Sequence, residues 1–579
     1  MMAVLFRGPQ LLALLGLVLF TLAPIVPYKG FPWPSLWNES VAVFACLLLG
    51  LAVLSARGFV ISPQEVSRPA VVLLFIVLSS VWVQKILGVL DWRGDAWLIS
   101  LYLSLFALAI VASRALTSGA DGSGWRIGFL LVFLGAGLSS VAIAMAQWLW
   151  FIAPVVFITE IEVGDRPYAN LGQPNHLSTL CFFALCCALE LRRTRVVGRT
   201  GTLLALALLT FGMALTQSRT GVLQWGLLFV FGLWARPGAG APHWGALALA
   251  LGLLWWALLP WLYDALLLQG GMRAMADSDG SGRLQIWRAF WDAVWLRPWA
   301  GWGWLQSGWA QQTVAACHPD TMVYFSYTHL LPLDLILWLG LPLGLLMCAL
   351  LVWWLAPYLT RARSAQAGYW LVAVLGVGLH ALLEYPLAYL YFLLPVGLMI
   401  GVIEAQVPVH RMLRLPAWSM GLAWLALAGL AAVVLVDAVR ASHAYTEVRF
   451  AEARIGTRSA PPEVPDLVLL DQLQALVQLR ATAVDVVPSP ATVELARRVA
   501  QRQPLRWVSL RYAQLLALSG QHDAAAREQQ RLCDINGATQ CVFWGRLWDE
   551  WRSTRAPQGL AIEPFRGRVL ASRCDGGDA

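Results

Sequence analysis

The sequence has few charged side chains and almost no lysine. Charged residues make up 13% of the 579 positions, whereas hydrophobic residues make up 59%. Soluble domains carry about 25% charged residues, so this composition excludes an ordinary soluble protein and indicates many membrane spans. Lys29 and Lys85 are the only lysines, and the arginines are dispersed among apolar runs. Without a basic stripe that includes aromatic residues, the net charge of +8 does not indicate nucleic-acid binding.

Metal-binding and redox motifs are also missing. The nine cysteines form no Cys-x-x-Cys pair, and no histidines cluster with zinc spacing. We therefore expect no metal and no other cofactor. Cys533 and Cys541 lie eight residues apart in the polar C-terminal part of the chain, where an oxidising compartment would allow a disulfide between them. The first apolar run has only a weak cleavage-site pattern, and we interpret it as a membrane anchor.

Long apolar runs follow one another from residue 11 to residue 437. A span needs about 20 residues, and this length predicts about thirteen transmembrane helices. Their expected ranges are 11–28, 40–55, 69–88, 96–113, 127–150, 176–191, 200–216, 220–235, 244–268, 329–356, 367–383, 387–404 and 417–438.

Arginines fall in alternate breaks between these runs, which predicts that those breaks are cytoplasmic. The N-terminus is then cytoplasmic. The loop 151–175, the long loop 264–328 and the region after residue 440 are then on the outer side of the membrane.

The chain becomes polar after Arg440, with charges at helical intervals. We predict a transmembrane catalytic domain over 1–440 and a helical periplasmic domain over 441–579. Within the second domain, the segment 504–532 resembles one tetratricopeptide hairpin, and a plain helical bundle is the alternative. We expect this domain either to cap the membrane domain or to hold an acceptor protein.

Three external segments carry candidate site residues. Arg219 begins a helix, where its guanidinium adds to free backbone N–H groups and favours an anion; contact with lipid headgroups is the alternative. In the loop before the sixth span, Gln173, Asn175 and His176 offer polar groups suited to sugar hydroxyls. A lone histidine, His329, stands where a very apolar helix is expected to begin.

The long loop contains three tryptophans spaced four residues apart: Trp287, Trp291 and Trp295. This spacing predicts an aromatic face on a helix, most simply a membrane-surface anchor, with an acceptor platform as the alternative. Asp277 and Asp279 could hold a metal, but an Asp/Gly turn is the commoner meaning of this pattern.

Five short motifs follow one another along the chain. They are Gly172-Gln-Pro-Asn-His176, Thr216-Gln-Ser-Arg-Thr-Gly221, Gly282-Arg283, Thr328-His329-Leu-Leu-Pro-Leu-Asp334 and His380-Ala-Leu-Leu-Glu-Tyr-Pro-Leu387. Their order resembles the O-antigen ligase/polymerase superfamily. Within it, the Gln-Pro-Asn-His and Leu-Glu-Tyr-Pro-Leu elements, together with a helical domain after the last span, look most like the PglL-type O-linking protein oligosaccharyltransferases.

The resemblance implies an all-α, glycosyltransferase-C-like enzyme of the bacterial inner membrane. Such an enzyme moves an oligosaccharide from an undecaprenyl diphosphate-linked donor to a serine or threonine hydroxyl of a periplasmic protein, and a type IV pilin is one candidate.

The resemblance also assigns roles to residues. Arg219 and Arg283 would neutralise the diphosphate without a metal ion. His329 would be the base, since an imidazole with a reference pKa of about 6.5 can accept a hydroxyl proton. The expected substrate-binding residues are Gln173, Asn175, His176, Arg288, Glu384 and Tyr385.

Other functions remain open at this stage. An O-antigen ligase that transfers glycan to lipid A-core, or an O-antigen polymerase, would share the donor chemistry. A transporter is the non-enzyme alternative, but it predicts ionisable residues at span centres and paired repeats. The charges here gather instead at the expected external ends of spans.

Overall fold

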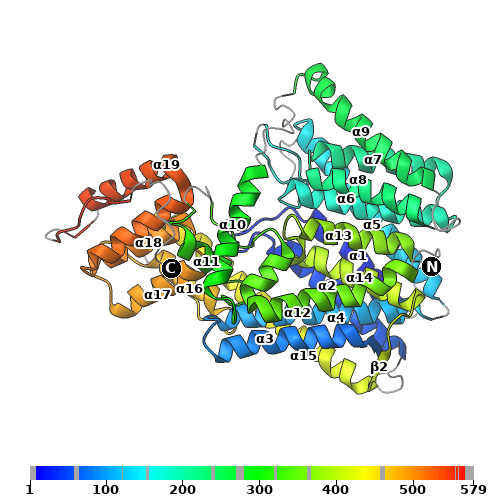
Figure 1. Ribbon diagram of the computed structural model, residues 1–579, viewed down its shortest axis with the longest axis horizontal. Coiled ribbons are helices and arrows are strands. Elements are labelled where there is room, and N and C mark those ends of the chain that lie inside the picture. The colour runs from blue at the N-terminus through cyan, green and yellow to red at the C-terminus, as the bar shows by residue number, and fades with distance from the viewer. Residues whose placement is uncertain are drawn as a thin grey trace. The chain divides into compact units, whose positions relative to one another are not determined.

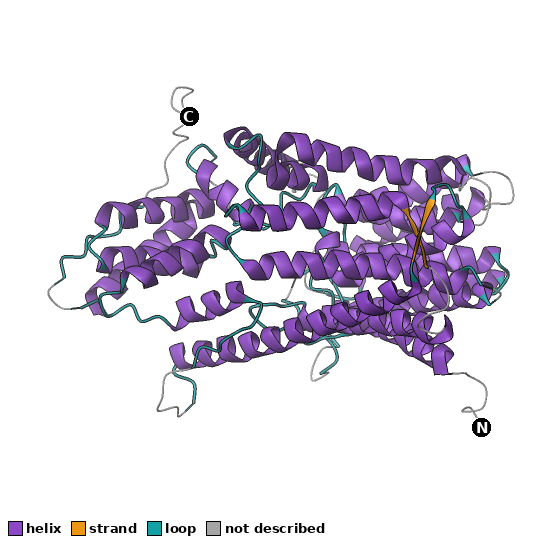
Figure 2. Ribbon diagram, turned by 90° about the horizontal axis from the view of Figure 1, so that it is seen from below, coloured by secondary structure: helices purple, strands orange, loops and turns teal. Residues whose placement is uncertain are grey.

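The computed structural model consists almost entirely of helices, with one two-stranded ribbon, in the part of the chain that it describes (Figures 1 and 2). That part comprises residues 8–57, 64–119, 121–151, 156–162, 164–235, 242–268, 280–318, 323–361, 367–456, 463–554, 556–557 and 560–567.

The helices of the first part of the chain are α1 (Gly8–Leu22), the 3-10 turn η2 (Ala23–Ile25), α2 (Leu36–Arg57), α3 (Arg68–Ile86), α4 (Arg93–Thr117), α5 (Gly122–Trp148), α6 (Pro174–Arg193), α7 (Arg199–Leu215), α8 (Arg219–Trp234) and α9 (Pro242–Ala265). They are followed by α10 (Gly280–Leu296), α11 (Ser307–Val314), α12 (Leu331–Arg361), α13 (Gly368–Ala381), η4 (Pro386–Ala388), α14 (Leu390–Gln406), α15 (Ala417–Glu452), α16 (Asp471–Ala481), α17 (Pro490–Arg502), α18 (Arg506–Leu518) and α19 (His522–Thr554).

Each of the thirteen expected spans coincides with one of these helices, which confirms an all-α polytopic membrane protein. Among the described residues, nine helices are long and apolar enough to cross a bilayer, while α7, α13 and α14 are apolar but shorter. The expected break at Tyr385-Pro386 is present as η4. Many helix ends differ from the expected ones by several residues. At the histidine loop, α12 begins two residues after His329. The largest difference is in α15, which continues to Glu452 because its polar final turns still pack against other helices.

The chain forms two compact units. Unit 1 comprises Met1–Ile76, Leu101–Ser278 and Leu350–Ala432, and unit 2 comprises Val77–Ser100, Asp279–Ala349 and Val433–Ala579. The boundary predicted near residue 440 falls within α15.

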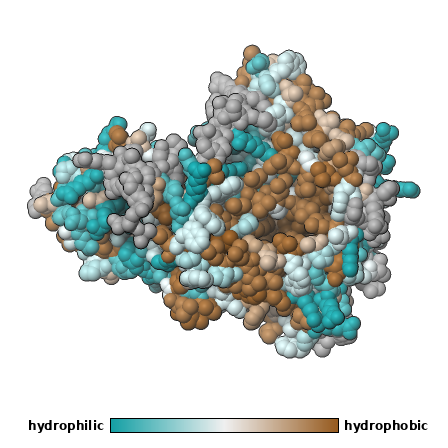
Figure 3. All heavy atoms as spheres, viewed as in Figure 1, coloured by the Kyte–Doolittle hydropathy of each residue, from teal (hydrophilic) through white to brown (hydrophobic). Residues whose placement is uncertain are grey.

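In unit 1, helix α6 is buried along almost its whole length by α5, α7, α8 and α13 (Figure 1). Small residues permit this close packing, since a Cβ on Gly137 would lie 2.3 Å from the side chain of Ala184. Hydrophobic residues cover much of the visible surface of unit 1 (Figure 3). Exposed hydrophobic side chains on α8 and α9 include Leu233, Leu254 and Trp261. An apolar exterior of this kind is suited to lipid acyl chains.

Strands β1 (Gln64–Ser67) and β2 (Met412–Leu415) pair antiparallel, with Glu65 opposite Arg414. Glu65 also lies 2.8 Å from Arg114, and this hydrogen-bonded guanidinium, more than the neighbouring Arg414, lowers the pKa of the carboxyl. The ribbon therefore ties a break near the start of the chain to one near residue 414.

In unit 2, α12 contains a kink at Gly340, where the backbone has φ 79°. The segment before α11 satisfies the backbone groups that the kink leaves without helical partners: Trp302 N–H donates to Leu337 O at 2.8 Å, and Leu341 N–H donates to Pro298 O at 2.7 Å. A Cβ on Gly340 would lie 2.4 Å from the carbonyl oxygen of Trp299, so only glycine fits here.

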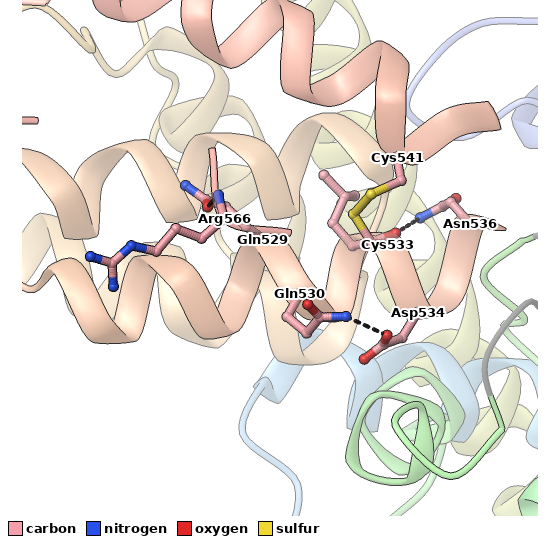
Figure 4. Close-up of a disulfide and its surroundings, with 8 residues drawn as sticks. Gln529, Gln530, Cys533, Asp534, Asn536, Cys541 and Arg566 are labelled. Atoms are coloured by element: carbon pink, nitrogen blue, oxygen red, sulfur yellow. Dashed lines mark hydrogen bonds between the residues drawn. A yellow bond between two sulfur atoms is a disulfide. The ribbon is translucent and has the colours of Figure 1, made fainter. Parts of the chain in front are cut away.

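Helices α16 to α19 form a bundle in the C-terminal part of unit 2, with hydrophilic residues on the visible surface (Figure 3). The expected hairpin segment 504–532 contains α18 and the first part of α19, joined at Gly520 with φ 76°. Figure 4 shows the disulfide between Cys533 and Cys541, which spans a break in α19 at Gly537.

Candidate active site

The Gln-Pro-Asn-His motif forms the entry to α6 in unit 1. Gly172 has φ 77°, a left-handed conformation that glycine adopts readily, and it turns the chain so that Pro174 is the first residue of the helix. The carbonyl of Gln173 then accepts a hydrogen bond from His176 N–H at 3.1 Å. Asn175 is thereby fixed in the first turn of α6.

The side chain of Asn175 joins three of the sequence motifs. Its carbonyl oxygen accepts a hydrogen bond from Ser218 Oγ at 2.7 Å, and its amide donates to Glu384 Oε1 at 3.4 Å. Ser218 is the N-cap of α8, because its hydroxyl also accepts from Gly221 N–H at 3.3 Å. The start of α6, the start of α8 and the turn after α13 are therefore held together.

Arg219 is the first residue of α8, as expected, and its side chain is exposed. The helix can approach α6 closely because residue 221 is glycine: a Cβ there would lie 2.4 Å from Ser178 Oγ. Sequence reasoning missed a second arginine, Arg166, which donates to the carbonyls of Thr216 and Gln217 at 3.3 and 3.4 Å. These bonds brace the turn that precedes Arg219.

His176 is 1% exposed. Its ring packs edge-on against Tyr389 and Phe392, with centroids 4.8 and 5.2 Å apart, and its Nδ1 lies 3.5 Å from the hydroxyl of Tyr391. This position does not fit the direct sugar contact expected for His176, because the surrounding aromatic rings enclose the imidazole. The position fits a structural role, in which the imidazole packs against Tyr389 and Tyr391 and holds them in place.

A buried hydrogen-bond network lies further along α6, beyond His176. Thr179 Oγ1 lies 2.8 Å from His380 Nδ1, and the amide of Gln224 donates to Thr179 Oγ1 at 3.0 Å. This network connects α6, α8 and α13, so it fixes the relative position of the helices that carry Asn175 and Arg219.

The turn after α13 carries Glu384 and Tyr385. Glu384 N–H donates to His380 O at 2.8 Å, and its side chain is largely buried beside Asn175. The ring of Tyr385 stacks on that of Tyr389, with an interplanar angle of 25° and centroids 6.1 Å apart. The turn therefore places the carboxyl group of Glu384 directly before a stacked pair of aromatic rings.

The segment between η2 and α2 contains Lys29, and the first turn of α2 contains Glu39. Lys29 Nζ donates to Asn38 Oδ1 at 2.6 Å, and burial lowers the pKa of this amine to about 8, against a smaller upward pull from Glu39. Glu39 itself accepts hydrogen bonds from Trp33, Ser35 and Tyr102. These hydrogen bonds attach the segment with Trp33 and Ser35 to α2 and α4.

His329 lies in unit 2, in a left-handed conformation with φ 60°. A non-glycine residue with positive φ costs about 1 kcal/mol or more, so it needs support from its neighbours. Thr328 N–H donates to Asp334 Oδ1 at 2.7 Å, and Trp287 Nε1–H donates to Thr328 O at 3.0 Å. These bonds fix the peptide next to His329, whose ring meets Phe325 edge-on. Sequence reasoning missed this function of Asp334 and Trp287.

Arg283 and Arg288 both lie on α10, and Arg288 is exposed. The predicted aromatic face of this helix is divided. Trp291 and Trp295 are exposed, with ring centroids 6.0 Å apart, whereas Trp287 turns toward Thr328. One tryptophan therefore serves the histidine loop, and the other two remain available for a membrane surface.

The expected metal alternative, Asp277 and Asp279, lies outside the described residues. Across the ranges that the structure describes, no three His, Cys, Asp or Glu side chains are grouped so that they could hold a metal ion.

Comparison with known proteins gives two family matches and two curated relatives. Residues 204–348 match the family model described as O-Antigen ligase, and residues 369–534 match the one described as Virulence factor membrane-bound polymerase, C-terminal. The chain is 30% identical to the General O-oligosaccharyltransferase of Acinetobacter baylyi, over 91% of this chain and 92% of that protein. It is 27% identical to the ComP-specific O-oligosaccharyltransferase of the same organism, over 66% of this chain and 69% of that protein. No solved structure matches.

Proposed function

The chain belongs to the O-oligosaccharyltransferases of the O-antigen ligase family, and we propose that its donor is an undecaprenyl diphosphate-linked oligosaccharide and its acceptor a serine or threonine hydroxyl of a periplasmic protein. It is a multi-pass membrane enzyme that transfers an oligosaccharide to protein. A type IV pilin is one candidate acceptor. We further propose the inner membrane as its location, with a cytoplasmic N-terminus and a periplasmic domain after residue 440.

The junction at Asn175 is the observation that carries the proposal. It fixes the first turn of α8, where backbone N–H groups have no helical partners and where Arg219 adds a guanidinium. A diphosphate is an anion with the geometry that a guanidinium fork binds well. Arg283, in the first turn of α10, is proposed as the second diphosphate ligand.

His329 is proposed as the general base. The acceptor hydroxyl gives its proton to the imidazole while its oxygen attacks the anomeric carbon of the first sugar. The bond between that carbon and the diphosphate oxygen breaks, and the lipid diphosphate leaves with the electron pair. The two arginines stabilise the negative charge that develops on the leaving group.

Glu384, Tyr385, Gln173 and Arg288 are proposed as substrate-binding residues, the first two on the sugar side. Support comes from the stacked pair formed by Tyr385 and Tyr389, and from the position of Glu384 directly before Tyr385 in the same turn. Asn175 is proposed to act through Ser218 and Glu384, and His176 through the tyrosines that enclose it.

The test is His329→Ala in the full-length membrane protein. We expect glycan transfer to an acceptor protein to be abolished, as measured by mass spectrometry of the acceptor, while expression and insertion stay normal. His318→Ala is the matched control, because His318 lies in the same long segment and pairs with Asp292 at 2.7 Å instead. Wild-type glycan occupancy in His329→Ala would remove this residue from the mechanism. Transfer to lipid A-core in place of protein would favour the ligase reaction.

A further inference from the structure

The C-terminal end of α17 carries a buried ion pair within unit 2. Arg502, the last residue of the helix, donates through Nε and Nη2 to the two carboxylate oxygens of Asp95 at 2.7 and 2.6 Å. Asp95 is fully buried in the first turn of α4. A bidentate ion pair with a buried carboxylate fixes the position of both residues.

The last carbonyls of α17 contact the segment that leads to His329. The final carbonyls of a helix have no partners inside it. Here Gln312 Nε2–H donates to Ala500 O at 2.9 Å, and the Tyr324 hydroxyl donates to Arg502 O at 3.4 Å. The packing is close, since a Cβ on Gly308 would lie 2.6 Å from the ring of Tyr324 and 2.9 Å from Pro504.

The same segment continues to His329 through further contacts. Gln311, on α11, donates to Val323 O at 3.0 Å and accepts from Phe325 N–H at 2.9 Å. The ring of Phe325 then meets the ring of His329, with centroids 5.4 Å apart. His329 lies five positions after Tyr324, and both ends of this stretch are anchored, one by α17 and α11 and the other by Asp334.

We infer that Arg502 and Asp95 are positioning residues for His329, and that helix α17 of the C-terminal bundle sets the geometry of the transfer reaction. The inference rests on the proposed role of His329 as base. A base must lie within hydrogen-bond reach of the acceptor hydroxyl, and a displacement of 1 Å can cost about a hundredfold in rate. The ion pair holds the end of α17, and the end of α17 holds Tyr324.

The test uses full-length Arg502→Gln and Tyr324→Phe, each assayed with a folded acceptor protein and with a short soluble serine peptide. We expect kcat to fall about tenfold in Arg502→Gln and about threefold in Tyr324→Phe, equally for both acceptors, with the donor KM unchanged. Arg502→Lys, which keeps the charge, should recover part of the loss. The matched control is Arg497→Gln on the same helix, because Arg497 forms an exposed ion pair with Glu494 and should leave kcat at the wild-type value.

Two outcomes would overturn the inference. Wild-type kcat in Tyr324→Phe, with or without a loss in Arg502→Gln, would show that the contact of Tyr324 with α17 does not affect catalysis. A loss confined to the protein acceptor would show that α17 recognises the partner instead. Tyr324→Phe removes a single hydroxyl group, so it remains informative even where Arg502→Gln fails to fold. His329→Ala, assayed in parallel, separates the two proposals: full activity in that variant refutes the base, whereas its inactivity combined with normal Tyr324→Phe refutes only the positioning role.

Discussion

At the residue scale, Arg219 combines two sources of positive potential. Its guanidinium adds to the N-terminal end of the α8 dipole, and Ser218 caps the same turn. Arg166 braces the preceding turn through the carbonyls of Thr216 and Gln217. The backbone position of Arg219 is therefore fixed by hydrogen bonds of Ser218 and Arg166.

Replacing Arg219 by lysine keeps the charge but removes the planar fork. If the guanidinium binds a diphosphate through two hydrogen bonds, transfer should fall about tenfold or more, because the loss of one charge-assisted hydrogen bond costs about 1.5 kcal/mol or more. Initial rates with a lipid diphosphate-linked donor would measure this loss. Arg199→Lys is the matched control, because Arg199 is also exposed and also begins a helix. Equal rates in both variants would leave Arg219 only a general electrostatic role.

Lys29 predicts a pH dependence of stability. Its pKa is about 8 in the folded protein, mainly because of burial, whereas a lysine in an unfolded chain has a pKa of about 10.4. Between these values the unfolded state binds more protons, so the contribution of Lys29 to stability rises with pH. The thermal midpoint of the wild type, relative to Lys29→Met, should therefore increase from about pH 7 to about pH 10. A difference that stays constant over this range would contradict the lowered pKa.

At the element scale, the start of α8 shows how a helix terminus becomes a candidate anion site. The N-cap hydroxyl of Ser218 both caps the helix and donates to Asn175, which in turn reaches Glu384. The start of α12 is similar, because Asp334 accepts a hydrogen bond from the backbone N–H of Thr328, the residue before His329. In both places one side chain of a helix orders the loop or helix next to it.

Ser218→Ala should destabilise the protein by about 1 kcal/mol, the usual cost of losing an N-cap, and should also reduce transfer because Arg219 loses its fixed turn. Thermal stability and initial rate would be measured on the same preparation. Ser489→Ala is the control, since Ser489 caps α17 in the same way through Thr492 N–H, at the opposite end of this helix from Arg502 and its contact with Tyr324. We expect similar destabilisation there, with wild-type transfer. Equal activity losses in the two variants would mean that the Ser218 effect is only one of stability.

At the scale of the whole molecule, the two units divide the candidate site residues. Arg219, Asn175 and Glu384 belong to unit 1, whereas Arg283 and His329 belong to unit 2. Unit 2 also contains the C-terminal bundle, so the segment that carries His329 and helices α16 to α19 form one compact body. This grouping gives the bundle a direct structural connection to the proposed base.

The proposed orientation can be tested with single cysteines at exposed positions. Val487→Cys, in the C-terminal bundle, should react with a membrane-impermeant maleimide in cells whose outer membrane alone is permeable. Val196→Cys, in the arginine-rich break after α6, should react only after the inner membrane is opened. The native cysteines Cys46, Cys181, Cys186 and Cys187 are buried and should contribute little background. The reverse labelling pattern would invert the topology.

The sequence by itself determined the membrane class, the thirteen helical segments, the break at Tyr385-Pro386 and the placement of Arg219 at a helix start. Each of these depends on local properties: the length of an apolar run, a proline, or a change from apolar to polar residues. The order of the motifs also indicated the family that the relatives then established.

Only the tertiary structure decided which of these residues meet. The junction of Asn175 with Ser218 and Glu384, the burial of His176, the turn of Trp287 toward Thr328 and the pair formed by Asp95 and Arg502 all join positions far apart in the chain. Hydropathy and spacing record only the neighbours of a residue along the sequence. Contacts of this kind depend on how helices pack, and packing is decided by the shapes and hydrogen-bonding groups of all the side chains together.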